Sequence, residues 1–154
     1  MGRAGLSWGC EHVHEEGIAM IVFVAGPSRQ LDRCIRVRTA LIRLGFLVPC
    51  DWMGRMVERR DRGLVDADMT DDENMDARTY DLAGVDAADA VLWLDEGSRG
   101  ATFEAGYATN AGKLVVAVGT EMLSLYSRTA PIRFSKDSEA IEYLVMVARE
   151  RGAR

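Results

Sequence analysis

The sequence predicts an α/β protein built on a doubly wound, five-stranded parallel sheet, flavodoxin-like or Rossmann-like in strand order. Short apolar runs of strand length, such as Ala90–Leu94 and Leu114–Val118, show no polar alternation. This pattern is typical of parallel strands that are buried on both faces. Segments with helical spacing separate the runs, so strands and helices alternate and favour right-handed crossover connections.

The composition narrows the classes of function. At 154 residues, with 48% hydrophobic and 28% charged residues, the chain has the size and balance of one soluble domain. A net charge of −5 gives no electrostatic basis for binding duplex nucleic acid, and no apolar run approaches the roughly 20 residues of a membrane helix. Cys10, Cys34 and Cys50 show neither metal-site spacing nor a disulfide framework. We therefore expect a cytoplasmic protein in a reducing setting, with no nucleic-acid or membrane partner.

Residues 1–17 do not have the pattern of a folded element, since they combine glycines and mixed charge without apolar periodicity. We expect a flexible N-terminal extension here and a single α/β domain over residues 18–154. Cys10, His12 and His14 are metal-ligating residue types, but they lack the second matched pair of a zinc site. A tail is therefore the favoured interpretation, and no metal site is expected.

The first predicted strand, Ile18–Ala25, leads into the turn Gly26-Pro27-Ser28-Arg29. Asp32 is the predicted cap of the following helix, in which apolar residues recur at helical spacing until Gly45. A glycine-containing turn between a strand and a helix N-terminus is suited to an anion, although a tight turn with a solvated Arg29 has the same pattern. Phe46–Val48 is the predicted second strand.

The segment Asp51–Asp76 is rich in charge and is predicted to be a solvated loop over the candidate site. It lacks the spacing of a calcium-binding EF-hand loop. Trp52, Met53 and Met56 would either pack on a flat ligand or anchor this loop to the core. A helical pattern returns from Asp76 to Ala88 and carries Asp81.

The segment between strands Ala90–Leu94 and Leu114–Val118 carries the strongest functional pattern. Gly97, Ser98 and Gly100 form a flexible turn, after which a helix is predicted to begin at Thr102 and to end at Gly112. Ligands of such sheets bind beyond the carboxyl ends of the strands. Glu104 would lie there in the first helical turn, where free N–H groups stabilise a carboxylate or a ligand phosphate.

The remaining chain completes the predicted sheet. Glu121–Thr129 is expected to be a loop or short helix, and Pro131–Phe134 an edge strand. Ser135 or Asp137 would cap a final helix with an apolar stripe. This gives five strands in all.

These residues together resemble the nucleoside 2-deoxyribosyltransferase superfamily. The resemblance rests on Tyr80-Asp81-Leu82, Ala88-Asp89-Ala90-Val91, the run Gly97–Ala108 and Gly112-Lys113, and the opening Phe23-Val24-Ala25-Gly26-Pro27 fits as well. It covers roughly Met20–Val118. It implies an enzyme that acts on a nucleoside or nucleotide without a cofactor, as a homodimer or larger homo-oligomer, with Glu104 and Asp81 as catalytic residues.

Position 98 separates two branches of this superfamily. Transferases usually carry an Asp six positions before the catalytic Glu, where this chain has Ser98. A Ser there is similar to the 2′-deoxynucleoside 5′-phosphate N-hydrolases, in which it helps to hold the 5′-phosphate. A hydroxyl, backbone N–H groups and an Arg fork suit a phosphate. The implied substrate-binding residues are Gly26, Ser28, Arg29, Ser98 and Gly100, although the hydrolases' first loop is usually richer in Gly and Arg.

Breaking an N-glycosidic bond builds positive charge on the sugar, while the base leaves as an anion unless it is protonated. Retaining glycosidases meet both needs with two carboxyl groups about 5–5.5 Å apart. Glu104 is the predicted nucleophile, kept ionised by the helix N-terminus, and Asp81 the predicted proton donor or sugar-orienting residue. Without the resemblance, a dipole-favoured Glu and a surface helix Asp would fit the spacing as well.

The favoured function is hydrolysis of a (deoxy)nucleoside 5′-monophosphate to free base and (deoxy)ribose 5-phosphate. The alternative is a nucleoside 2-deoxyribosyltransferase that exchanges bases on free nucleosides, against which Ser98 argues. A further alternative is a non-catalytic nucleotide-binding or sensing module. Such modules often keep the glycine turns but lack the catalytic Glu and its Asp partner, both of which are present here.

Overall fold

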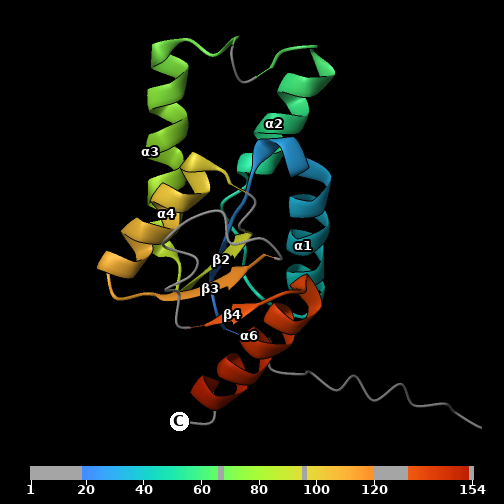
Figure 1. Cartoon of the computed structure of the whole chain (residues 1–154), viewed down its shortest axis with the longest axis vertical. Coiled ribbons are helices and arrows are strands. Elements are labelled where there is room, and N and C mark those ends of the chain that lie inside the picture. The colour runs from blue at the N-terminus through green and yellow to red at the C-terminus, as the bar shows by residue number, and fades with distance from the viewer. Residues whose placement is uncertain (1–18, 66–67, 95–96, 120–131, 153–154) are drawn as a thin grey trace, which may run out of the picture.

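The computed structural model of the chain describes residues 19–65, 68–94, 97–119 and 132–152. Its centre is a parallel sheet of four strands, β1 (Val22–Ala25), β2 (Ala90–Leu94), β3 (Leu114–Val118) and β4 (Arg133–Phe134), which neighbour one another in that order (Figure 1). Val22 pairs with Ala90, and Ala90 pairs with Leu114. All four residues of β1 and all five of β2 are buried, which confirms the prediction of strands covered on both faces.

The predicted second strand, Phe46–Val48, is reduced to one parallel bridge between Leu47 and Ile21. Two hydrogen bonds make it, from Val22 N to Leu47 O at 2.9 Å and from Leu47 N to Met20 O at 3.0 Å. Pro49 has no N–H with which to extend the ladder, so pairing stops after one residue. The bridge lies on the edge of β1 opposite β2. The flavodoxin-like order is therefore confirmed, with four strands instead of the five predicted.

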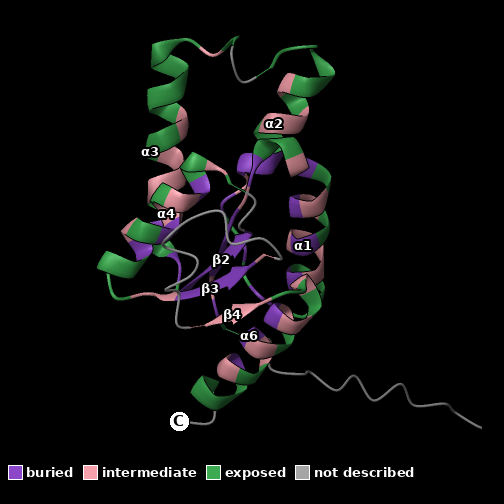
Figure 2. Cartoon of the chain, in the orientation of Figure 1, coloured by how far each residue is buried: buried purple, intermediate pink, exposed green. Residues whose placement is uncertain are grey.

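Helices cover both faces of this sheet. They are α1 (Leu31–Arg43), α2 (Trp52–Asp61), α3 (Asp71–Ala87), α4 (Arg99–Asn110) and α6 (Asp137–Gly152), with a short 3-10 turn, η1 (Ser28–Gln30), before α1. In Figure 1, α3 and α4 lie on one side of the sheet, while α1 and α6 lie on the other. Figure 2 shows the buried residues gathered on the strands and on the inner helix faces. Each helix thus contributes one apolar face to a single core.

The predicted loop over residues 51–76 is wrong for most of its length. Asp51 caps α2, accepting a hydrogen bond from Gly54 N at 3.0 Å, and Thr70 forms a capping box with Glu73 at the start of α3. The acidic run after Thr70 is the first turn of α3, where the helix dipole favours carboxylates. Charge in this segment reflects the outer faces of two helices rather than an absence of structure.

Of the two open interpretations of Trp52 and Met53, the structure supports the anchor. Both side chains are buried, and the Trp52 indole donates a hydrogen bond to Val24 O at 2.8 Å. The start of α2 is thereby fixed to β1, while the far ends of α2 and α3 extend beyond the sheet (Figure 1).

Several predicted helix starts need correction, and α3 begins at Asp71 rather than at Asp76. Asp32 lies in the first turn of α1, whose N-cap is Gln30, and α4 begins at Arg99 rather than at Thr102. The predicted helix ends are confirmed, because Gly45 and Gly112 follow α1 and α4 with positive φ angles of 92° and 71°. The N-terminal extension and the segment Glu121–Thr129 lie outside the described residues. No helix in the described part of the chain combines the length and apolarity needed to cross a bilayer.

Candidate active site

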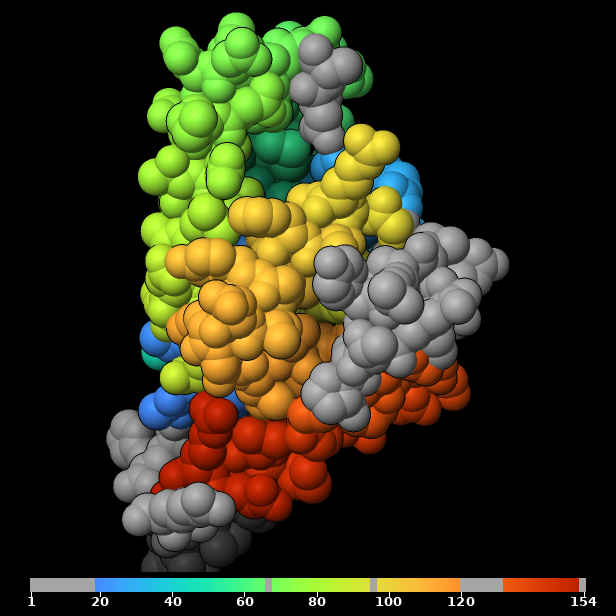
Figure 3. All heavy atoms as spheres, turned by 60° about the vertical axis from the view of Figure 1, so that its left-hand side comes forward, coloured from blue at the N-terminus to red at the C-terminus, as the bar shows by residue number. Residues whose placement is uncertain are grey.

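A cleft of about 620 Å³ opens beyond the carboxyl ends of β1 and β2, where ligands of such sheets bind. Its walls come from the turn after β1, from α2 and α3, and from the first turns of α4. In Figure 3 the surface is hollowed between the light green atoms of α3 and the yellow atoms of α4, with the darker green of α2 behind. We call this the carboxylate cleft, because Asp81 and Glu104 both line it.

Asp81 reaches the carboxylate cleft because α3 packs very closely on the sheet. A Cβ at Gly84 would lie 2.7 Å from Cys50 Sγ and 3.0 Å from Phe23 Cδ2, so only glycine allows this approach. Asp81 stands three residues earlier in α3, on the same side of the helix. Its side chain is half-buried as a result.

Glu104 reaches the same cleft from the second turn of α4. The prediction that it lies in the first turn, ionised by the helix N-terminus, is therefore wrong. Burial, together with the Asp81 carboxylate, raises the pKa of Glu104 to about 8. The effect of the helix dipole falls off within the first turn and does not prevent this rise.

Asp81 is perturbed in the same direction but less. Burial raises its pKa to about 6, while the Arg55 guanidinium opposes the rise. Two carboxyl groups whose environments separate their pKa values are typical of acid–base sites. Near neutral pH the pair therefore holds about one proton, and the rise in pKa is the larger at Glu104.

The candidate phosphate-binding residues Ser98 and Gly100 also line the carboxylate cleft. Ser98 caps α4, its Oγ accepting a hydrogen bond from Ala101 N at 3.3 Å. Gly100 follows in the first turn, and the nearest atom to a Cβ built there is Ser98 Oγ at 3.9 Å, so backbone N–H groups lie next to open space. The α4 N-terminus therefore faces the cleft as an anion site would require.

Gly26 and Ser28 also line the carboxylate cleft. A Cβ at Gly26 would lie 2.6 Å from Cys34 Sγ, so this glycine permits close packing of the turn against α1. Arg29, in contrast, lines a second cleft and is not in the wall of the carboxylate cleft. The structure thus brings together the catalytic candidates and all the substrate-binding candidates except Arg29.

Sequence reasoning missed several residues of the carboxylate cleft, including two arginines that lie over aromatic rings. The Arg55 guanidinium carbon is 3.8 Å from the centroid of the Tyr80 ring, and that of Arg78 is 5.4 Å from the Phe103 centroid. Arg78 could have been found, because it stands three residues before Asp81 on one helix. Arg55 could not, because its segment was predicted to be a loop.

Residues near the site have structural roles. Asp89 accepts a hydrogen bond from Ile21 N at 2.8 Å and tethers the start of β2. Lys113 donates to the carbonyl oxygens of Asp86 and Ala88, both at 2.7 Å. Burial raises the pKa of the Cys50 thiol to about 12, so this thiol stays protonated and is a poor nucleophile. Among the described residues, no three His, Cys, Asp or Glu side chains gather as a metal site requires.

No protein-family model and no curated protein matches the sequence. Among solved structures, the chain is similar to a 2-deoxyribosyltransferase from the psychrotolerant bacterium Bacillus psychrosaccharolyticus, with a TM-score of 0.59 and 18% identity over 80% of this chain and 91% of that chain. It is also similar to the CMP N-glycosidase BcmB of Clostridium botulinum, with a TM-score of 0.50 and 18% identity over 82% of this chain and 98% of that chain. The chain therefore has the nucleoside 2-deoxyribosyltransferase-like fold that the sequence resemblance implied.

Proposed function

We propose that this protein hydrolyses the N-glycosidic bond of a (deoxy)nucleoside 5′-monophosphate and releases the free base and (deoxy)ribose 5-phosphate. The observation that carries the proposal is the convergence of Glu104 and Asp81 on one cleft beside a helix N-terminus. The two similar structures are a deoxyribosyltransferase and a CMP N-glycosidase, which supports N-glycosyl chemistry on this fold.

The protonation state of the Glu104 and Asp81 pair suits the first half of such a reaction, in which the bond to the base breaks. Between about pH 6 and about pH 8 the pair holds one proton, on Glu104. That proton passes to the departing base through Asp81, as the bond from C1′ to the base nitrogen breaks. Glu104 is left as a carboxylate and forms a bond to C1′. The same proton transfer therefore protonates the leaving base and turns Glu104 into the nucleophile.

Water completes the reaction. It attacks C1′, the bond between C1′ and Glu104 breaks, and the proton released from the water returns to the carboxyl pair. The product carries a hydroxyl at C1′, and the pair regains its starting protonation. No group outside the two carboxyl groups and water is needed for this balance.

The 5′-phosphate would bind at the start of α4. Ser98 and the first-turn N–H groups of that helix offer hydrogen bonds and a favourable dipole. Arg78 and Arg99 add positive charge to the same cleft. This combination favours a nucleotide over an uncharged nucleoside.

A deoxyribosyltransferase is the second candidate, and the higher TM-score of the transferase structure favours it. The first half of the reaction is identical, and a second base replaces water in attacking C1′. The two functions therefore differ in the acceptor and in the need for a 5′-phosphate.

The test is incubation with a panel of ribo- and deoxynucleosides and their 5′-monophosphates, with released base measured by chromatography. Base release from monophosphates alone is expected. Release from nucleosides, with a new nucleoside formed when an acceptor base is added, would assign the transferase instead. An absence of base release from every compound, together with tight binding of an intact nucleotide, would contradict both and indicate a binding module.

A further inference from the structure

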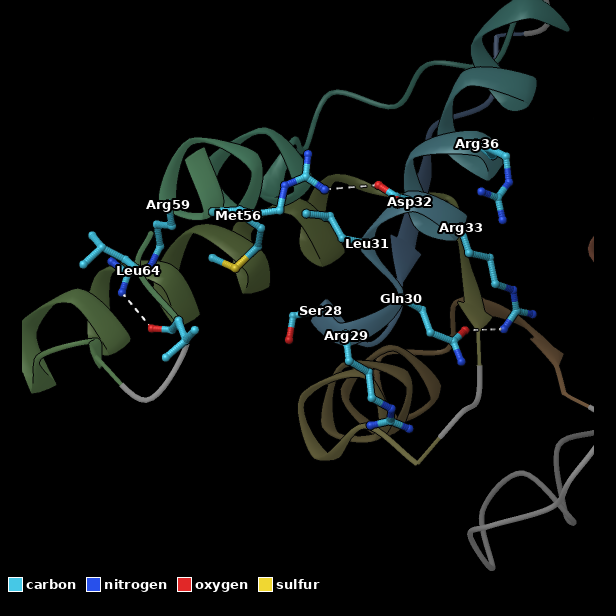
Figure 4. A pocket seen from close by; sticks show the side chains of 12 residues that line it. Ser28, Arg29, Gln30, Leu31, Asp32, Arg33, Arg36, Met56, Arg59 and Leu64 are labelled. Carbon is cyan, nitrogen blue, oxygen red and sulfur yellow. Dashed lines mark hydrogen bonds and ion pairs between the residues drawn. The ribbon is translucent and has the colours of Figure 1, made fainter. Parts of the chain in front are cut away.

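A second cleft, of about 800 Å³, lies next to the carboxylate cleft, and both are lined by Ser28 and Met56. We call it the arginine cleft. Five arginines and a single acidic residue, Asp32, line it, as Figure 4 shows from close by. In a chain of net charge −5 this is a local reversal of sign. The arginines are Arg29, Arg33, Arg36, Arg59 and Arg60.

Part of this positive charge has acidic partners. Arg33 forms an ion pair with Asp137 at 2.6 Å, Arg59 with Glu73 at 3.3 Å, and Arg60 with Asp32 at 3.2 Å. The last pair is exposed to solvent and is therefore weak. Arg33 and Arg59 are thus held in place, whereas Arg60 is available to an incoming anion.

The rest of the charge is uncompensated within the described residues. No ion pair is formed there by Arg29 or Arg36. Arg59 Nε is buried and has no hydrogen-bond partner in this part of the chain, although the outer nitrogens of the guanidinium bind Glu73 and Val65 O. A buried donor without a partner is costly, and an anion could satisfy it.

Apolar side chains lie between the arginines. Leu31 and Met56 occupy the middle of the view in Figure 4, with Leu64 at one side. Low-dielectric walls strengthen the field of the surrounding charges in a cleft of one sign. Arg forks around such a cleft suit the oxygens of a phosphoryl group.

We propose that the arginine cleft binds a phosphoryl group in addition to the 5′-phosphate in the carboxylate cleft. Because the two clefts meet at Ser28 and Met56, this group is either the distal phosphate of a nucleoside diphosphate or part of a separate phosphate-bearing effector. The first source rests on the proposed function, since it requires the sugar to lie at Glu104. The second source does not.

The site itself is tested by calorimetric titration of the protein with inorganic pyrophosphate, without divalent cations. The test variant is Arg36→Ala/Arg60→Ala. The control variant, Arg43→Ala/Arg62→Ala, removes the same charge from the ends of α1 and α2 at positions that line neither cleft. We expect wild type and control to bind alike and the test variant to bind at least about tenfold more weakly. No binding to wild type, or equal losses in both variants, would overturn the site.

The source is then tested by base release. If the distal phosphate of the substrate binds here, the test variant raises KM for nucleoside diphosphates at least about tenfold and leaves monophosphates unchanged. If an effector binds here, pyrophosphate changes monophosphate turnover in wild type and not in the test variant. If pyrophosphate binds, but the test variant leaves KM for nucleoside diphosphates unchanged and pyrophosphate leaves monophosphate turnover unchanged, the cleft holds an adventitious ion only and the proposal fails. A protein that releases no base disproves the proposed function, and the titration alone then decides the site.

Discussion

The two clefts that meet at Ser28 differ in how their charged side chains respond to pH. In the carboxylate cleft, Asp81 and Glu104 are half-buried, and burial raises the pKa of both into the neutral range, with the Asp81 carboxylate adding to the rise at Glu104. In the arginine cleft, the charges are permanent, and two of them, Arg33 and Arg59, are held in place by acidic partners. Burial therefore lets the carboxylate cleft bind and release a proton near neutral pH. The arginine cleft keeps the same positive charge throughout this range. The first is suited to chemistry and the second to recognition.

The largest effect is expected from removing the carboxyl group of Glu104. Glu104→Gln keeps the size of the side chain but leaves neither an acid nor a nucleophile, so we expect kcat for base release to fall by about 10³-fold or more. The measurement is released base under saturating nucleotide. The exposed Glu142→Gln on α6 is the matched control, and we expect it to retain full activity. Full activity in Glu104→Gln would exclude the proposed nucleophile.

A smaller effect is expected from Asp81→Asn, about 10²-fold in kcat/KM, because the nucleophile remains. The sharper result is the pH profile. The Asp81 carboxylate raises the pKa of Glu104, so its removal lowers that pKa and moves the alkaline limb of kcat/KM to lower pH.

Asp86→Asn removes the same charge from α3 at an exposed position that lines neither cleft. Its profile should match that of wild type. An alkaline limb that stays in place in Asp81→Asn would show that the two carboxyl groups do not share a proton.

The sequence predicted the sheet far better than the neighbourhood of its carboxyl edge. Ala90–Leu94 and Leu114–Val118 are β2 and β3 with unchanged bounds, because a continuous apolar run depends only on local composition. The segment 51–76 failed for the opposite reason. The helix α3 extends beyond the sheet, so most of its residues are polar and its apolar periodicity is weak, while α2 has only ten residues, half of them polar.

The features of the candidate site also divide into those that the sequence could predict and those that it could not. Asp81, Glu104 and Ser98 could be identified from spacing and resemblance, and the structure places all three in one cleft. The raised pKa of Glu104 could not be predicted, since it follows from burial in the folded protein and from the Asp81 carboxylate of another helix. The arginine cleft was missed because its residues come from α1 and α2, and α2 was not foreseen.

Gly26 lines the carboxylate cleft two residues before Ser28, where the two clefts meet. A Cβ there would lie 2.6 Å from the sulfur of the fully buried Cys34, so Gly26→Ala should lower the free energy of unfolding by about 1–3 kcal/mol. Chemical denaturation measures this loss. Gly26→Ala/Cys34→Ala removes the clashing sulfur and should cost less than the two single variants combined. Additive losses would show that the turn does not rest on Cys34.

The smallest expected effect is on stability, and it depends on pH. The pKa of Glu104 in the folded protein is raised to about 8 from its ordinary 4.5, so the folded state binds a proton that the unfolded state releases above pH 4.5. This contribution to stability is complete below pH 4.5 and is lost as pH rises towards 8. Glu104→Gln cannot ionise, so it should be more stable than wild type at pH 8, by on the order of 1–2 kcal/mol after solvent screening, and equally stable near pH 4.5. Thermal unfolding of both proteins across this range measures the difference. A constant difference in stability at every pH would mean that the folded protein holds Glu104 ionised near neutral pH. The carboxylate cleft would then carry a constant charge at Glu104, as the arginine cleft does, and the contrast between the two clefts would fail.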